Sequence, residues 1–201
     1  MNQPHDNSSI VYTRKASCRD CHRCVRACPV KAIRIVSGQA SVVEERCIHC
    51  GTCIRECPQR AKAYRTDVDR VREWIGQGRS VAVSIAPSFA ALFEDWERKR
   101  LPSVLRKLGF SFVAETAVAA EWVAERARTV ARSAPGRTLL WTSCPAVIGY
   151  LETQRPDLVE LLLPVATPMV AHGRAMKRRL GADTRTVFIG PCVAKKAEAL
   201  R

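Results

Sequence analysis

The sequence lacks any apolar run long enough to cross a membrane, which takes about 20 residues. Its longest candidate, residues 158–171, is interrupted by Glu160, Pro164 and Pro168. The first residues of the chain are polar and lack the basic-then-apolar pattern of an export signal. These absences predict a cytoplasmic protein with no membrane span.

Acidic side chains are comparatively few, with 19 Asp and Glu against 33 Lys and Arg, for a net charge of +14. Such an excess favours an anionic partner, which could be nucleic acid, anionic lipid or an acidic protein. Long basic runs are missing as well, since the densest groups, residues 98–100 and 177–179, contain three cations each. We interpret the charge as a solvated basic surface and keep nucleic-acid binding as the alternative.

Cysteine is almost absent outside one short stretch of the chain. Eight of the ten cysteines lie between residues 18 and 57, and only Cys144 and Cys192 stand elsewhere. This distribution excludes an evenly cross-linked secreted scaffold. Clustered cysteines in a chain that is not exported indicate metal binding in a reducing compartment.

The clustered cysteines form one internal repeat. Two runs of the form Cys-x-x-Cys-x-x-Cys-x-x-x-Cys-Pro begin at Cys18 and Cys47, 29 residues apart. Three thiolates on one tight loop can bind three corners of an iron–sulfur cubane, and the fourth cysteine at this spacing binds the other cluster of a pair. Structural zinc is the alternative, but its sites usually combine two separate Cys-x-x-Cys knuckles.

The spacing therefore predicts two [4Fe-4S] clusters with crossed ligands. Cluster 1 is assigned Cys18, Cys21, Cys24 and Cys57, and cluster 2 is assigned Cys47, Cys50, Cys53 and Cys28. Because both quartets are complete, we interpret His22 and His49 as solvent-facing spacers. With this motif, residues 11–66 resemble the bacterial ferredoxins that carry two [4Fe-4S] clusters. The resemblance implies an electron relay.

The remaining pattern predicts secondary structure on both sides of residue 66. Residues 32–43 alternate around a Ser-Gly pair, which indicates a β-hairpin, and residues 61–66 suggest a closing strand. Further on, strands are expected at residues 80–86, 110–113, 138–142 and 186–189. Helices are expected at residues 67–77, 102–108, 117–133 and 167–180, with another starting at Pro145. Strands that alternate with helices predict an α/β layer with parallel strands.

The two isolated cysteines, Cys144 and Cys192, each stand between a predicted strand and a predicted helix. Ligands in α/β folds gather at the C-terminal ends of strands, so the two thiols could face one site. An isolated cysteine is also commonly a small buried hydrophobe. The residues alone leave both interpretations open.

The segments around these cysteines carry a second resemblance. Residues 142–145, Thr-Ser-Cys-Pro, and residues 191–198, Pro-Cys-Val-Ala-Lys-Lys-Ala-Glu, resemble two motifs of the [FeFe] hydrogenase catalytic domain. Residues 84–88 and 167–171 also look like that family, in the right order. The resemblance implies a partial iron-hydrogenase-like fold. In it, Cys144 and Cys192 would be cubane ligands of an H-cluster-like site, and Lys195 would hydrogen-bond a cyanide of the di-iron unit.

The sequence also departs from the hydrogenase pattern. Ser143 stands where the family has a proton-relaying cysteine, and Gly190 stands where it has methionine. The third family motif, which supplies two more cysteines, is missing from these 201 residues. We expect either the front part of a longer protein or a vestigial site. The candidates for a catalytic role are Ser143, a poorer proton carrier than a thiol, and Lys195.

These observations predict an α+β ferredoxin-like two-cluster domain at residues 11–66, after a flexible N-terminus at residues 1–10, followed by an α/β domain at residues 67–201. The predicted function is iron–sulfur electron transfer in hydrogen or redox sensing. An acidic ferredoxin or a flavoprotein is the expected redox partner, with a downstream signalling domain or subunit. The first alternative is an [FeFe] hydrogenase that catalyses 2H⁺ + 2e⁻ ⇌ H₂ and is truncated here or completed by another chain. The second is a basic nucleic-acid-binding module in which the clusters are structural.

Overall fold

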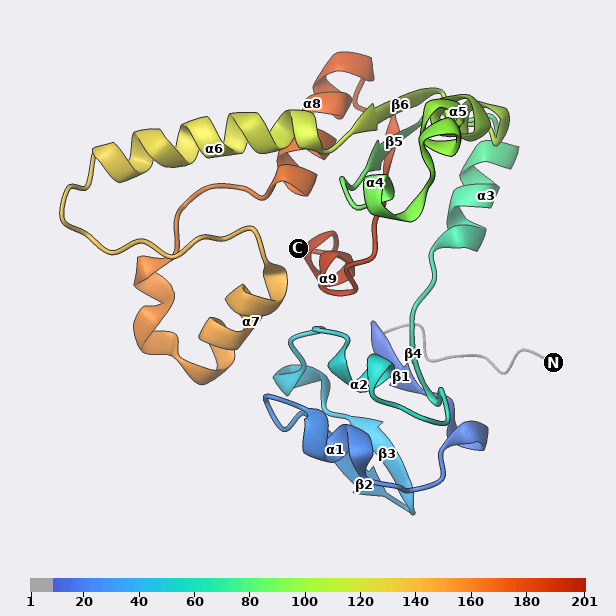
Figure 1. Ribbon diagram of the computed structural model, residues 1–201, viewed down its shortest axis with the longest axis vertical. Coiled ribbons are helices and arrows are strands. Elements are labelled where there is room, and N and C mark those ends of the chain that lie inside the picture. The colour runs from blue at the N-terminus through green and yellow to red at the C-terminus, as the bar shows by residue number, and fades with distance from the viewer. Residues whose placement is uncertain (1–8) are drawn as a thin grey trace. The chain divides into compact units, whose positions relative to one another are not determined.

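The computed structural model describes residues 9–201 and divides the chain into two compact units (Figure 1). The cysteine unit comprises the chain up to Thr66 together with the segments Cys144–Leu162 and Cys192–Arg201. The sheet unit comprises Asp67–Ser143 and Leu163–Pro191. All ten cysteines therefore belong to the cysteine unit, although two of them are remote in sequence.

Most of the predicted flexible N-terminus, residues 1–10, lies outside the described residues. Its last residue, Ile10, is buried and accepts a backbone hydrogen bond from the Arg65 amide at 2.9 Å. The division into domains at residues 11–66 and 67–201 is drawn from the sequence motifs. That these two parts fold independently stays a prediction. Among residues 9–201, every helix is too short or too polar to cross a membrane.

Two antiparallel strand pairs and two very short helices frame the cysteine runs. The elements are β1 (Val11–Thr13) paired with β4 (Lys62–Tyr64), the hairpin of β2 (Ile33–Val36) and β3 (Gln39–Val42), and the helices α1 (Arg23–Ala27) and α2 (Thr52–Arg55). The predicted hairpin and closing strand are confirmed. Ser37 and Gly38 both have positive φ, at 50° and 72°, as a two-residue hairpin turn requires.

The sequence repeat is also a repeat of backbone conformation. Positive φ angles recur at pairs of positions 29 apart, namely Asp20 and His49, His22 and Gly51, and Lys31 and Arg60. A non-glycine residue in this region costs about 1–3 kcal/mol and persists only where its surroundings impose it. Each cysteine loop therefore follows the same strained course, and that course determines where its thiols lie.

The core around the cysteines is small. It is built from side chains such as Val30, Ala32, Ile33 and Ile48, with the sulfurs of Cys24 and Cys28 among them. No aromatic ring belongs to this cluster of described residues. So little apolar surface gives a weak hydrophobic contribution, which a bound metal group would supplement.

Two later segments complete the cysteine unit. They contain α7 (Pro145–Gln154), a 3₁₀ helix (Pro156–Leu161) and α9 (Ala194–Glu198). The two α-helices are in contact, and the Arg201 guanidinium donates to both carboxylate oxygens of Glu152 at 3.1 and 2.9 Å. This bidentate pair ties the segment that follows Cys192 to the helix that follows Cys144.

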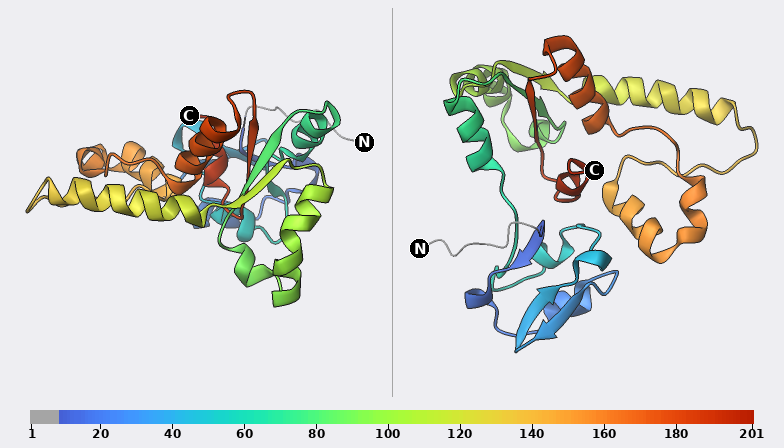
Figure 2. Two further views of the ribbon diagram at one scale, coloured as in Figure 1. Left: turned by 90° about the horizontal axis from the view of Figure 1, so that it is seen from above. Right: turned by 180° about the vertical axis from the view of Figure 1, so that it is seen from behind.

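The sheet unit contains three parallel strands in the order β6–β5–β7 (Figure 2). They are β5 (Val81–Ile85), β6 (Phe112–Glu115) and β7 (Arg185–Ile189). The central β5 is buried along its whole length, which explains its nearly continuous apolar sequence. The parallel α/β layer is confirmed.

Five helices belong to the sheet unit. They are α3 (Val68–Gly76), α4 (Phe89–Leu92), α5 (Asp95–Lys107), α6 (Ala117–Arg132) and α8 (Pro168–Leu180). α3 and α5 contribute Trp74, Ile75 and Leu105 to the core around β5, and α8 packs against α6 and β7. Gly109 ends the turn after α5 at φ 102°, where a Cβ would lie 2.4 Å from Ile75.

The helix predicted at residues 102–108 begins earlier than expected, at Asp95. Glu94 and Glu97 form a reciprocal capping box, which satisfies backbone N–H groups at the true start. Pro102 was expected to open the helix but lies inside it.

The strand predicted at residues 138–142 is wrong. Only Leu140 makes an isolated bridge, and the Thr142 hydroxyl donates to the carbonyls of Leu163 and Val165 at 3.2 and 3.0 Å. The Thr142 side chain thus ties this segment to residues 163–165 in place of the continuous backbone hydrogen bonds of a β-ladder. Cys144 consequently follows an irregular segment rather than a strand.

Candidate iron–sulfur sites

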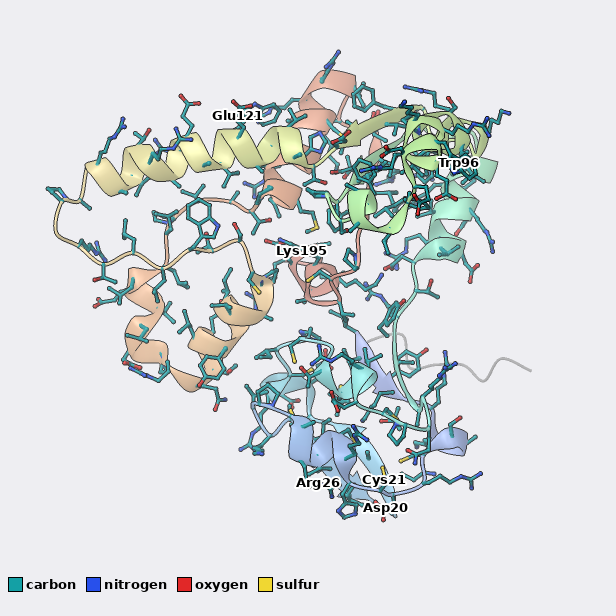
Figure 3. All side chains as sticks on the ribbon, viewed as in Figure 1. Asp20, Cys21, Arg26, Trp96, Glu121 and Lys195 are labelled. Carbon is teal, nitrogen blue, oxygen red and sulfur yellow. The ribbon has the colours of Figure 1, made fainter. Side chains whose placement is uncertain are left out.

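The first cavity of the cysteine unit is lined by the four thiols assigned to cluster 1. Cys18, Cys21 and Cys24 come from the first run, and Cys57 ends the second run. The unfilled space within the cavity and at its mouth, open solvent included, is about 320 Å³. Figure 3 shows Asp20 and Cys21 side by side on the loop that precedes α1.

The second cavity repeats this arrangement with the thiols assigned to cluster 2. Cys47, Cys50 and Cys53 line it together with Cys28, and the unfilled space in it and at its mouth, open solvent included, is about 340 Å³. Among residues 9–201, no three His, Cys, Asp or Glu side chains converge on a point that could hold a single metal ion. Each quartet surrounds a space instead.

Side-chain contacts hold the end of the second run against the loop of the first. The Cys21 Sγ donates to Gln59 Oε1 at 3.5 Å, and the Cys57 Sγ lies 4.0 Å from the same oxygen. The Arg23 guanidinium forms an ion pair with Glu56 at 3.2 Å. Residues 56–59 are thereby fixed beside the first loop, where Cys57 completes the first quartet.

Each crossing cysteine accepts a hydrogen bond from the backbone. The Ala32 amide donates to Cys28 Sγ at 3.2 Å, and the Ala61 amide donates to Cys57 Sγ at 3.2 Å. A neutral thiol is a weak acceptor, whereas a thiolate is a strong one. The two sites therefore present an N–H group to a sulfur that metal binding would deprotonate. Hydrogen bonds to ligand sulfurs also tune cluster potentials.

Burial perturbs three of the eight thiols. It raises the pKa of Cys47 to about 11 and the pKa of Cys53 to about 12. Burial also raises the pKa of Cys24, while the positive charge of Lys62 opposes that rise. These thiols are protonated at neutral pH when no metal is bound, so metal binding must release protons from them.

The two histidines within the cysteine loops differ in exposure. The His22 side chain is half exposed and lies 3.0 Å from Asp20, as a solvent-facing spacer would. The expectation is wrong for His49, whose side chain is only 14% exposed and whose Nε2 lies 3.0 Å from Glu44 Oε1. The ring thus contacts the short 3₁₀ helix before Cys47, Glu44–Arg46.

Cys144 and Cys192 are both exposed, so neither is a buried hydrophobe. Cys144 is the N-cap residue of α7, and Cys192 lies two residues before α9. Both segments pack on the second cysteine loop, because a Cβ on Gly149 would lie 3.5 Å from Ile48 and a Cβ on Gly51 would lie 3.7 Å from Val193. The two isolated thiols therefore come from segments that adjoin the cluster 2 loop.

The other predicted site residues already have protein partners. The Lys195 ammonium, labelled on α9 in Figure 3, donates to Glu198 at 2.7 Å, and both side chains are 13% exposed. The Ser143 hydroxyl accepts a hydrogen bond from the indole of Trp141. At Gly190, a Cβ would lie 2.7 Å from the Phe188 ring and 2.9 Å from Ala86. Methionine at this position would require that ring to move.

Sequence reasoning missed a buried polar chain in the sheet unit. Thr116 donates its only hydroxyl proton to the Ile85 carbonyl at 2.9 Å, so Ser84 must donate to Thr116 at 2.6 Å. Ser84 then accepts from His172 Nδ1 at 2.7 Å, which places the imidazole proton on that nitrogen. Burial lowers the pKa of His172. These residues come from three elements, and no local pattern in the sequence connects them.

Sequence reasoning also missed Lys62. This lysine is 4% exposed on β4 and lines the first cavity. It stands in a segment that alternation alone identifies as a strand, where a buried cation is unexpected.

Comparisons with known proteins give family matches in both parts of the chain. The cysteine loops and the match of residues 10–58 to the 4Fe-4S dicluster domain define an iron–sulfur protein. Residues 79–201, more than half of the chain, match the iron only hydrogenase large subunit, C-terminal domain. The chain therefore belongs to the iron-only hydrogenase large-subunit family.

Two solved [FeFe]-hydrogenase structures share the fold. One, from work on oxygen inactivation through modification and degradation of the H-cluster 2Fe subcluster, is 23% identical with a TM-score of 0.52, over 68% of this chain and 42% of that one. The other, from work on stepwise H-cluster assembly, is 24% identical with a TM-score of 0.54, over 68% of this chain and 40% of that one. The chain thus spans about two fifths of these hydrogenases. No curated protein matched it.

Proposed function

We propose that the protein is an electron relay that binds two [4Fe-4S] clusters with crossed ligands. The observation that carries this proposal is the pair of similar cavities, each lined by three thiols of one run and the last thiol of the other. When bound, the clusters supply one-electron transfer. The chain holds them through Cys18, Cys21, Cys24 and Cys57, and through Cys47, Cys50, Cys53 and Cys28.

The residues around the quartets prepare them for anionic groups. The amides of Ala32 and Ala61 donate to the crossing sulfurs, and hydrogen bonds to ligand sulfurs tune the potential of a bound cluster. The net charge of +14 adds a positive field over the molecule. Both effects favour the extra negative charge of a reduced cluster. The same field suits an acidic redox partner, for which a ferredoxin or a flavoprotein is the proposed class.

The isolated cysteines and Ser143 support a sensory role. Cys144 and Cys192 are exposed, and both lie on segments that pack against the loop of the second quartet. A further iron–sulfur or H-cluster-like site held by these two thiols would exchange electrons with the second cluster. Ser143 would slow proton delivery there, because a hydroxyl loses its proton less readily than a thiol. Slow turnover suits redox or hydrogen sensing, with a signalling domain or subunit as the recipient.

Hydrogen turnover is the second candidate function. Membership of the iron-only hydrogenase family favours it. The ion pair between Lys195 and Glu198, both in the hydrogenase-like segment at residues 191–198, favours it as well. This chain contains two cysteines outside the quartets, so a complete H-cluster would need further ligands from additional sequence or from another chain.

Metal analysis of the purified, anaerobically reconstituted protein tests the relay. We expect about eight iron and about eight acid-labile sulfide per chain, with broad visible absorption that dithionite bleaches. A protein that instead holds about two zinc ions and no sulfide would overturn the proposal.

A further inference from the structure

The cysteine unit contains a buried cation without a carboxylate partner. Lys62 is 4% exposed on β4, and its ammonium donates to Thr13 Oγ1 at 2.5 Å and to the Ala40 carbonyl at 3.5 Å. Both acceptors are neutral. Within residues 9–201, the structure gives this ammonium no Asp or Glu partner.

A buried ammonium of this kind is costly. Removing a charge from water is strongly unfavourable unless an opposite charge or good hydrogen bonds compensate for it. Two neutral oxygens compensate in part, and neither supplies negative charge. The position of Lys62 therefore calls for an anion nearby.

The anion can be located from the surroundings of the ammonium. Lys62 lines the first cavity together with Thr13 and Ala40. The strand that carries Lys62, β4, also packs against α2, which contains Cys53 of the second quartet. Lys62 thus lines the first site and stands on a strand that adjoins the second.

We propose that Lys62 is a shared counter-ion for the two iron–sulfur clusters, buried in the cysteine unit where its charge favours their reduction. This inference rests on the proposed function. A cluster with four thiolates carries about −2 when oxidised and about −3 after it gains one electron from a reduced ferredoxin or flavoprotein. A fixed ammonium stabilises the second state more than the first. Burial keeps salt and water from screening its charge, unlike that of the surface cations.

The direct test is the pair of cluster midpoint potentials, measured by anaerobic redox titration with electron paramagnetic resonance detection. Lys62→Met keeps the length of the side chain and removes its charge. We expect reduction of both clusters to become about tenfold less favourable, a shift of about 59 mV to lower potential for a one-electron couple. Lys62→Arg keeps the charge and should stay within about twofold of wild type.

A matched control removes a lysine of the same unit that faces solvent. Lys15 is exposed, so Lys15→Met makes the same chemical change where water screens the charge. Its potentials should stay within about twofold of wild type. Equal shifts in Lys15→Met and Lys62→Met would overturn the inference, and so would unchanged potentials in a fully loaded Lys62→Met protein.

Iron content decides the outcome if Lys62→Met fails to hold clusters. A counter-ion role predicts that Lys62→Arg loads iron while Lys62→Met does not. A packing role predicts the reverse order, because methionine fits a small apolar core better than arginine. Failure of both variants would assign the requirement to side-chain shape and overturn the inference. A wild-type protein without clusters would instead refute the proposed function itself.

Discussion

Cys21 donates a hydrogen bond through its Sγ to Gln59 Oε1 at 3.5 Å, although 38 residues separate the two. Gln59 follows Cys57, so this contact places the end of the second cysteine run against the loop of the first. The ion pair between Arg23 and Glu56 reinforces the same approach. Each half of the repeat therefore needs the other to complete its site, and residues 11–66 should fold as one metal-dependent piece.

Iron removal tests this dependence. Chelation or deep oxidation should unfold residues 11–66, because their core contains small aliphatic side chains and cysteine sulfurs rather than large rings. The sheet unit, with β5 buried along its length, should retain its helical circular dichroism. Limited proteolysis with mass mapping would locate the unfolded part. Simultaneous loss of both units would contradict two independently stable parts.

Gly190 provides a test of packing just before the hydrogenase-like segment at residues 191–198. A Cβ there would lie 2.7 Å from the Phe188 ring, so Gly190→Ala should destabilise the protein by about 1–3 kcal/mol through overpacking. Denaturant unfolding followed by circular dichroism measures the change. The control is Gly76→Ala in α3, where a Cβ meets nothing within 4 Å. A Gly190→Ala protein with the same free energy of unfolding as wild type would contradict this prediction. It would mean that the Phe188 ring can move aside with no loss of stability.

His172 should make the sheet unit sensitive to acid. Burial lowers its pKa below the ordinary value of 6.5, so the unfolded chain binds more protons than the folded one as the pH falls below about 6.5. Stability is then lost with falling pH, by at most about 1.4 kcal/mol per pH unit for one group.

Denaturant unfolding of wild type and His172→Gln at pH 7.5 and pH 5.5 measures this effect. The difference between the proteins removes the contribution of the clusters, which both contain. We expect a shallower pH dependence in His172→Gln than in wild type. Equal slopes in wild type and His172→Gln would show that His172 does not titrate with unfolding.

The 201-residue chain should neither produce nor oxidise hydrogen at a substantial rate. An H-cluster cubane takes four thiolates, and outside the quartets this sequence offers Cys144 and Cys192. Co-expression with hydrogenase maturation proteins, followed by an assay with reduced methyl viologen, measures the rate. In a longer protein that supplies the missing ligands, Ser143→Cys should raise turnover on the order of 10²-fold, since a barrier lower by a few kcal/mol accelerates a step that much. Substantial activity of the 201-residue chain would contradict the expectation.

The local pattern of the sequence predicted much of the fold. Alternation around Ser37 and Gly38 identified the hairpin, and the apolar run at residues 80–86 identified the central strand of the sheet. Both signals are local, because a two-residue turn and a strand buried on both faces each leave a distinct composition. The 29-residue displacement of the cysteines likewise recurs in the backbone, at positive φ angles of paired positions.

The failures involve contacts between distant residues. Residues 138–142 have the composition of a strand, but the Thr142 hydroxyl bonds to carbonyls more than 20 residues later instead of joining a ladder. Lys62 appears as an ordinary strand lysine until its burial is known. His172 is paired with Ser84, 88 residues away, which no spacing rule links. Tertiary packing decides such positions, and a single sequence shows only local preference.

The crossed assignment of the cysteines is the central claim, and four single substitutions test it. In reduced, reconstituted protein, electron paramagnetic resonance spectra are compared for Cys24→Ser, Cys57→Ser, Cys28→Ser and Cys53→Ser. Each should lose or alter one cluster and leave the other. We predict that Cys28→Ser matches Cys53→Ser, and that Cys57→Ser matches Cys24→Ser, because each pair lines one cavity. A spectrum of Cys28→Ser that matches Cys24→Ser, its neighbour in the same run, would contradict the account.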